Sequence, residues 1–194
     1  MRRIITATVN NSSGVLNRIT GVISRRQYNI DSISVGWTEI PNVSRITIVV
    51  HVDSLYEIEQ VTKQLNKQID VLKVSDITDD AHIERELALL KINSPAALRS
   101  ELNAVIEPFR ATVIDVGTKN VVIQVTGTSE KIDAFVDTVR PYGIKQMART
   151  GVTGFTRSPK KNGLKSFTTE QSVALLASEQ HIAILKYKKK LVGG

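Results

Sequence analysis

The hydrophobic pattern of the chain repeats itself, and this repeat limits the possible folds more than any other feature. Residues 2–9, 28–39, 44–52 and 70–77 alternate apolar and polar positions, which is typical of strands. Residues 13–26 and a segment starting at Asp53 or Ser54 carry apolar residues at helical spacing. The first helix would bury Leu16, Ile19, Val22 and Ile23. The predicted order is βαββαβ.

The second half of the chain gives the same order. Strands are predicted at 85–92, 110–117, 120–127 and 144–151. One helix starts at Ser94-Pro95; a second is capped by Ser129 and ends at Gly143. The sequence therefore predicts an α+β chain of two ferredoxin-like βαββαβ domains, each a four-stranded sheet with two helices on one face. The other sheet face also carries apolar residues, so we expect oligomerisation.

Composition places the domain boundaries. Residues 76–84 are polar and acidic and read as a linker, which divides the chain into domains at 1–77 and 78–158. From Lys160 on, seven lysines and two glutamates give a net charge of +5, so only +2 of the total +7 belongs to residues 1–159. Residues 159–194 are predicted to be a basic tail, partly helical or disordered. The alternative for this tail is a helix that binds a membrane surface or a partner.

The sequence offers little for catalysis. The three histidines have no metal-ligand spacing, no phosphate loop or nucleophile motif occurs, and there is no cysteine. The acid pairs Glu57/Glu59 and Asp79/Asp80 are interpreted as solvated charges, and residues 84–87 as a network of charges on the surface. We therefore expect no catalytic residues, no metal site and no cofactor in this chain. The start lacks the pattern of a signal peptide and no apolar stretch reaches ~20 residues, so we expect a cytoplasmic protein.

RNA-recognition modules use the same βαββαβ order, so nucleic-acid binding is an alternative. Those modules stack bases on aromatic residues of the two central strands. Here the matching strands, 3–9 and 44–52, contain no aromatic residue. Because residues 1–159 are also nearly neutral, base recognition is disfavoured.

The segment 10–16, NNSSGVL, joins the first strand to the first helix. One interpretation is a turn with a serine that caps the helix. The other is a binding loop, because the first N–H groups of a helix lack internal partners and accept anions such as carboxylates. Gly14 would let a ligand approach the backbone. Asn10 points opposite to Asn11 in strand alternation, so Asn11 is the better candidate.

An ordered set of segments resembles one family. Residues 1–36, 41–50 and 64–78, followed by HIERELALLKI, EPFRATVIDV, TGTSEKIDAF and ARTGVTGF, are similar to the regulatory small subunit of acetohydroxyacid (acetolactate) synthase. The resemblance covers about residues 1–157. It implies an N-terminal ACT domain, a domain type that senses small molecules, and a related C-terminal domain.

The resemblance also implies a function. The chain would be a non-catalytic regulatory subunit that activates a catalytic large subunit and confers feedback inhibition by valine, leucine or isoleucine. Thiamine diphosphate, magnesium and FAD would lie on that large subunit, and no nucleic acid or membrane partner is implied. The alternative is a free-standing ACT-type sensor that regulates another enzyme.

The family pattern implies an effector site between two paired ACT domains. Carried over position by position, it involves one loop and the start of the second strand of the facing copy: Asn11, Ser12, Ser13, Gly14, Val15 and Leu16, then Asn29 and Ile30. This chain departs from the family where glycine usually precedes YNI, because Gln27 stands there. Trp37 and Ile40 also differ from the usual residues of the following hairpin.

Overall fold

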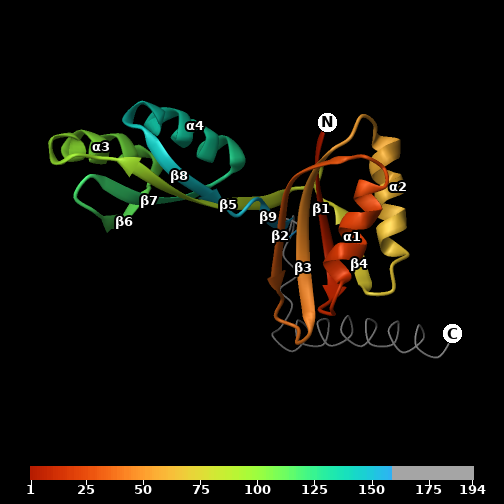
Figure 1. Ribbon diagram of the computed structural model, residues 1–194. Coiled ribbons are helices and arrows are strands. Elements are labelled where there is room, and N and C mark those ends of the chain that lie inside the picture. Colours follow the sequence, from red (N-terminus) through yellow and green to blue (C-terminus); the bar gives the residue numbers. More distant parts are fainter. Residues whose placement is uncertain (159–194) are drawn as a thin grey trace, which may run out of the picture. The chain divides into compact units, whose positions relative to one another are not determined.

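The structure is a computed structural model that describes residues 1–158 (Figure 1). The predicted tail, 159–194, lies outside the described residues. Two antiparallel sheets make up the described chain, each flanked by two α-helices. The predicted α+β class and repeated βαββαβ order are confirmed.

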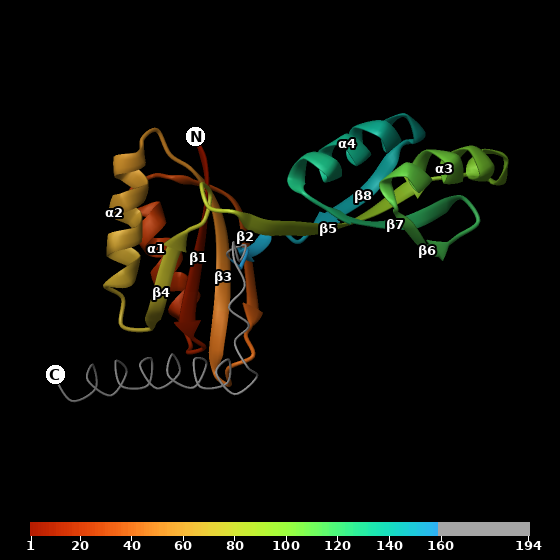
Figure 2. The same ribbon diagram turned by 180° about the vertical axis from the view of Figure 1, so that it is seen from behind.

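The first sheet has the strand order β2-β3-β1-β4. Its strands are β1 (Arg2–Asn10), β2 (Asn29–Trp37), β3 (Val43–His51) and β4 (Val71–Asp76). The helices α1 (Val15–Ser24) and α2 (Leu55–Asn66) lie on the same face of this sheet, as Figures 1 and 2 show from opposite sides. Their buried stripes pack on the alternate residues Ile5, Ala7 and Val9 of β1 and on Ile46, Ile48 and Val50 of β3.

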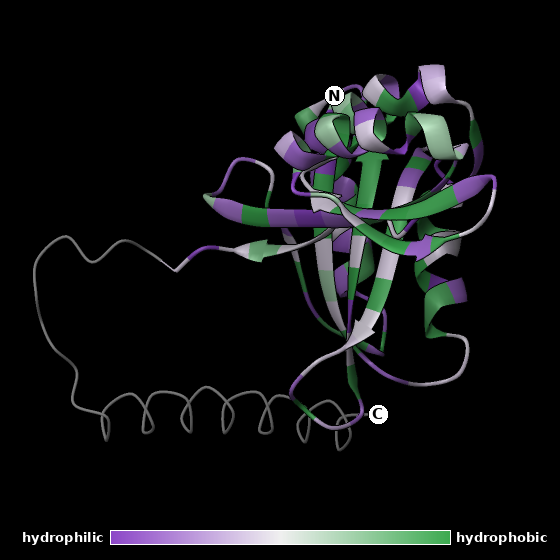
Figure 3. Ribbon diagram, turned by 90° about the vertical axis from the view of Figure 1, so that its left-hand side faces the viewer, coloured by the Kyte–Doolittle hydropathy of each residue, from purple (hydrophilic) through white to green (hydrophobic). Residues whose placement is uncertain are grey.

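The helix stripes agree with the prediction except at one position. Ile19, Val22 and Ile23 of α1 are buried as expected, but Leu16 is 40% exposed and Val15 is buried in its place. The stripe therefore begins one residue earlier than predicted. In Figure 3, α1 and α2 carry both apolar and polar residues, and apolar and polar residues alternate along the strands.

The second sheet has the order β6-β7-β5-β8. Its strands are β5 (His82–Asn93), β6 (Thr112–Val116), β7 (Asn120–Gly127) and β8 (Ile144–Arg149). Its helices are α3 (Arg99–Ile106) and α4 (Ser129–Val139), with short 3-10 helices η1 (Ala96–Leu98), η2 (Glu107–Phe109) and η3 (Arg140–Tyr142) beside them. Leu102, Ile106, Ile132 and Phe135 fill the core beneath the helices.

One strand was not predicted. β9 (Thr153–Thr156) pairs antiparallel with the first residues of β5, from His82 to Arg85. β5 is therefore longer than the predicted 85–92, and its first part extends away from the other strands of the second sheet. A four-residue strand carries too little alternation to stand out in the sequence.

Two predicted helix caps are wrong. The N-cap of α4 is Thr128, whose hydroxyl accepts a hydrogen bond from the Lys131 N–H, and Ser129 is the first helical residue. The N-cap of α1 is Gly14 in a left-handed conformation (φ 79°), so no serine side chain caps this helix. Ser54, one of two candidates, does cap α2.

Two of the acidic residues predicted at the surface form ion pairs: the Asp79 side chain stays 76% exposed, as predicted, whereas Glu86 is buried, so the predicted surface network is wrong at that residue. Asp79 accepts a hydrogen bond from Arg3 at 2.7 Å. Glu86 is only 6% exposed and accepts hydrogen bonds from Arg149 and Ser129. The hydrogen bonds from Arg3 to Asp79 and Asp76 raise the pKa of the Arg3 guanidinium, so this pair stays charged at the start of β1.

Candidate functional site

The loop between β1 and α1 is held by its backbone. The Asn11 N–H donates to the carbonyl of Asn42 at 2.7 Å, and the Ser12 N–H donates to the carbonyl of Asn10 at 2.9 Å. The Val15 N–H donates to the Ser12 carbonyl at 3.3 Å. These bonds shape the turn and use one N–H group of the first helical turn, that of Val15.

The free N–H groups of α1 are the main chemical feature of this loop. Within residues 1–158, the N–H groups of Ser13, Gly14, Leu16 and Asn17 have no hydrogen-bond acceptor. They lie at the positive end of the helix dipole, in an exposed loop. The arrangement can therefore accept a carboxylate through backbone donors.

Two residues that sequence analysis missed support this loop. Arg18 forms an ion pair with Asp70, and the Ser12 hydroxyl donates to Asp70 at 3.0 Å. The Asn10 N–H also donates to the Asp70 carbonyl at 2.8 Å. Asp70 therefore ties the loop to the start of β4. A Cβ on Gly14 would lie 3.1 Å from an Arg18 nitrogen, so this guanidinium lies directly beside the loop.

The other predicted site residues lie at the start of β2. Asn29 is exposed and Ile30 is half-buried. The Asn29 side-chain amide donates to the Asp31 carboxylate at 3.0 Å. This bond uses the Nδ2 of Asn29 and leaves its Oδ1 available as an acceptor for an ammonium group.

The strand register separates these two groups within one chain. Asn10 pairs with Val43 at one end of β3, whereas Asn29 pairs with His51 at the other end. Eight residues of extended strand span about 27 Å. The loop 11–16 and the start of β2 therefore cannot contact one ligand in a single copy. A site that uses both needs a second chain.

β2 offers a surface for that second chain. It is an edge strand of the first sheet, so one row of its N–H and C=O groups lacks a strand partner within the described residues. On the same face as the helices it carries Val35 and Trp37, which are 49% and 87% exposed. Leu16 is exposed on the neighbouring helix. These three apolar side chains are exposed in the single chain.

Other kinds of site are not evident in the described part of the chain. No group of three or more histidine or acidic side chains within residues 1–158 is arranged to hold a metal ion. Over the same residues, no helix combines the length and the apolar character needed to cross a bilayer.

The comparisons with known proteins identify a family for this chain. Residues 5–73 match a family model described as the small-subunit-like ACT domain of AHAS, and residues 85–158 match one described as the small subunit of acetolactate synthase. The acetolactate synthase small subunit of Bacillus subtilis is 56% identical over 168 residues, which are 87% of this chain and 98% of that protein. This chain belongs to the acetolactate synthase small-subunit family.

Further relatives support the assignment. The isozyme 3 small subunit of Escherichia coli is 42% identical, over 82% of this chain and 98% of that protein. A crystal structure of the acetolactate synthase small subunit from Thermotoga maritima has a TM-score of 0.74 and 32% identity, and covers 81% of this chain and 98% of that one. Since these relatives carry the name of one enzyme's small subunit, they favour that role over a free-standing sensor.

Proposed function

We propose that this small subunit regulates acetolactate synthase by binding a branched-chain amino acid between two of its ACT domains. It would raise the activity of the catalytic large subunit and make that activity sensitive to valine, leucine or isoleucine. The observation that carries the proposal is the group of free N–H donors at the start of α1, beside Gly14.

The chemistry of the two groups of residues supports an amino-acid ligand. The N–H groups near Gly14 and Leu16 would bind the carboxylate. The side-chain carbonyl oxygens of Asn11 and Asn29 would accept hydrogen bonds from the ammonium group. Leu16 and Ile30 would contact the branched side chain, because both are apolar and partly accessible. Ser12 would act through Asp70, which holds the loop.

Pairing through β2 would bring the two halves of the site together. In an antiparallel, two-fold pairing centred on Ile33, the start of β2 in one copy lies beside the end of β2 in the other. The end of β2, at Trp37, pairs with Ser44, next to Val43 and Asn10. The partner's Asn29 would therefore lie near the loop 11–16. The same pairing would cover Val35 and Trp37.

Catalysis would belong to the large subunit. Its reaction joins two pyruvates, or pyruvate and 2-oxobutyrate, and would use thiamine diphosphate, magnesium and FAD bound to that subunit. The small subunit would act through a coupling free energy between its effector site and the catalytic site, typically ~1–3 kcal/mol.

Reconstitution tests the proposal. The full chain is mixed with the large subunit, and acetolactate formation is measured alone, with the small subunit, and with each branched-chain amino acid added. We expect stimulation by the small subunit and inhibition by at least one amino acid. A mixture with no stimulation and no copurifying complex at micromolar concentration contradicts the regulatory role.

A further inference from the structure

The segment 150–153, which leads from β8 to the start of β9, contacts β2 of the first sheet at Ser32. Gly151 has a φ of +76°, and a Cβ placed on it would lie 2.7 Å from the Cβ of Ser32. The Ser32 hydroxyl accepts a hydrogen bond from the Val152 N–H at 3.3 Å. This contact therefore has no space between the two backbones for even one methyl group.

Val152 anchors the same segment. Its side chain is 2% exposed and packs with Ile4, Val49 and Ile77, on the sheet face opposite to the helices. These residues form a small core separate from the cores beneath the two helix pairs. The segment 150–153 is therefore packed against the first sheet while continuing directly from β8 of the second.

Ser32 is close to the proposed effector residues along β2. The register of β2 against β3 shifts between Ile30 and Ser32, so Asp31 is the extra residue of a bulge. Asp31 accepts the hydrogen bond from Asn29 and also pairs with His51 at 2.7 Å. One bulged residue thus separates the residues that would bind the ligand from the residue that contacts Gly151.

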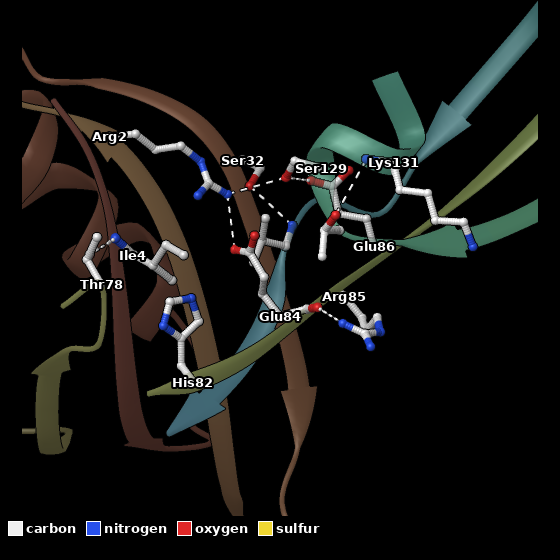
Figure 4. A network of polar contacts seen from close by, with 12 residues as sticks. Arg2, Ile4, Ser32, Thr78, His82, Glu84, Arg85, Glu86, Ser129 and Lys131 are labelled. Atoms are coloured by element: carbon white, nitrogen blue, oxygen red, sulfur yellow. Dashed lines mark hydrogen bonds and ion pairs between the residues drawn. The ribbon is translucent and has the colours of Figure 1, made fainter. Parts of the chain in front are cut away.

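A second connection joins β1 to the second sheet through polar groups (Figure 4). Arg2 donates to Glu84 at 3.2 Å and to the Ser129 hydroxyl at 3.3 Å. The Ser129 hydroxyl donates to Glu86 at 2.5 Å. These contacts link the start of β1 to β5 and to the start of α4.

A pocket of about 430 Å³ that opens to solvent is lined by residues of both connections. Its lining includes Arg2, Ser32 and Ile33 from the first sheet and Glu86, Ser129 and Arg149 from the second. Ser32 and Gly151 both line this pocket, and their close contact is a direct route from β2 to the segment 150–153.

We propose that Ser32 and Gly151 relay occupancy of the effector site from β2 to the second sheet. The inference rests on the proposed function. A ligand that binds the side-chain carbonyl oxygen of Asn29 favours one arrangement of the bulge at Asp31. Ser32 then moves against Gly151, and the segment 150–153 passes the displacement to β8 and β9. The two residues are positioning residues, since neither contacts the ligand.

The test compares Ser32→Val with Ser34→Val, each reconstituted with the large subunit. Ser34 is a matched control because it is half-buried on the same face of β2, two residues further on. Valine binding to the full-length small subunit is measured by calorimetry, and inhibition is measured on the holoenzyme. Hydrogen exchange of residues 150–156 is followed with and without valine.

We expect Ser32→Val to keep the valine Kd within twofold while the concentration for half-inhibition rises at least tenfold. Valine should change exchange at 150–156 in the wild type and in Ser34→Val but not in Ser32→Val. Inhibition of Ser32→Val at the wild-type concentration overturns the relay, and so does loss of valine binding, which would make Ser32 part of the binding site. A wild type that binds no branched-chain amino acid overturns the proposed function itself.

A second pair of variants approaches the contact from the other side. Gly151→Ala places a methyl group against Ser32, whereas Gly36→Ala on β2 has open space around the added Cβ. If Ser32→Val does not fold, Gly151→Ala must uncouple inhibition from binding while Gly36→Ala does not. If valine inhibits the Gly151→Ala holoenzyme at the same concentration as the Gly36→Ala holoenzyme, the relay is overturned.

Discussion

Arg149 donates two hydrogen bonds to one carboxylate oxygen of Glu86, from Nε at 3.0 Å and from Nη2 at 2.5 Å. The Glu86 side chain is 5% exposed and the Arg149 side chain 29%. Burial lowers the pKa of the Arg149 guanidinium, but the hydrogen bonds to Glu86 and Asp133 outweigh burial and raise it above its ordinary value. The pair is therefore a charged contact between β5 and β8, buried on the Glu86 side.

Glu86→Gln should lower the free energy of unfolding by about 2 kcal/mol, since it leaves a partly buried guanidinium without its main counter-charge. Urea titration of the full chain measures this. Asp133→Asn removes the other carboxylate of Arg149, which is 59% exposed, and should change stability by less than about 0.5 kcal/mol. Equal effects of the two substitutions would contradict the assignment of Glu86 as the buried partner.

Gln27→Gly should stabilise the protein. Gln27 has a φ of 59°, a left-handed conformation that disfavours residues with a Cβ. Glycine adopts it freely, so the free energy of unfolding should rise by about 1 kcal/mol. Arg25→Gly is the control: Arg25 has a φ of −61°, and glycine there should lower stability. A melting temperature for Gln27→Gly at or below that of the wild type would argue against the left-handed end of α1.

Most of the fold could be predicted from the sequence because its elements carry regular apolar periods. The exceptions are the short strand β9 and local choices between similar residues. Thr128 and Ser129 are neighbours that can both cap a helix, and here Thr128 is the cap while the Ser129 hydroxyl donates to Glu86. Val15 and Leu16 are both apolar, and only packing decides which of them is buried.

The candidate site could be predicted only in part, because its support comes from distant residues. The N–H donors follow from where α1 begins, and the resemblance points to Asn11 and Asn29. Arg18 and Asp70 are 52 residues apart, and no local pattern connects them. Likewise Glu86 and Arg149 are 63 residues apart, so the burial of Glu86 could not be read from its polar neighbours.

Gly14→Asp should abolish the effector response while the protein still folds. The added carboxylate would occupy the place proposed for the carboxylate of the ligand, and we expect the Kd to rise at least about a hundredfold, or about 2.7 kcal/mol. Aspartate and asparagine tolerate a left-handed φ better than other residues with a Cβ. Gly14→Asn is therefore a matched control for size and conformation without the charge.

Thermal unfolding with and without valine measures this difference. A ligand at 100 times its Kd stabilises the folded state by about 2.7 kcal/mol. We expect the wild type to show such stabilisation with its preferred amino acid, Gly14→Asn to show a reduced one and Gly14→Asp none. Equal stabilisation of Gly14→Asp and Gly14→Asn would mean that the carboxylate binds elsewhere.

A site shared between two copies predicts complementation. Asn11→Ala and Asn29→Ala should each lose effector binding, because each removes one half of every site. When the two variants are unfolded together and refolded as an equal mixture, half of the dimers contain one copy of each. In these dimers one site carries both substitutions and the other carries neither, so about a quarter of all sites should recover binding.

Calorimetry on the refolded mixture measures the recovered sites. The control is the double variant Asn11→Ala/Asn29→Ala mixed with either single variant, which contains no intact site in any pairing. Recovery in the first mixture alone supports a site completed by the partner's Asn29. No recovery in either mixture would mean that Asn11 and Asn29 do not act on the same ligand across two chains, since within one chain they lie at opposite ends of the first sheet.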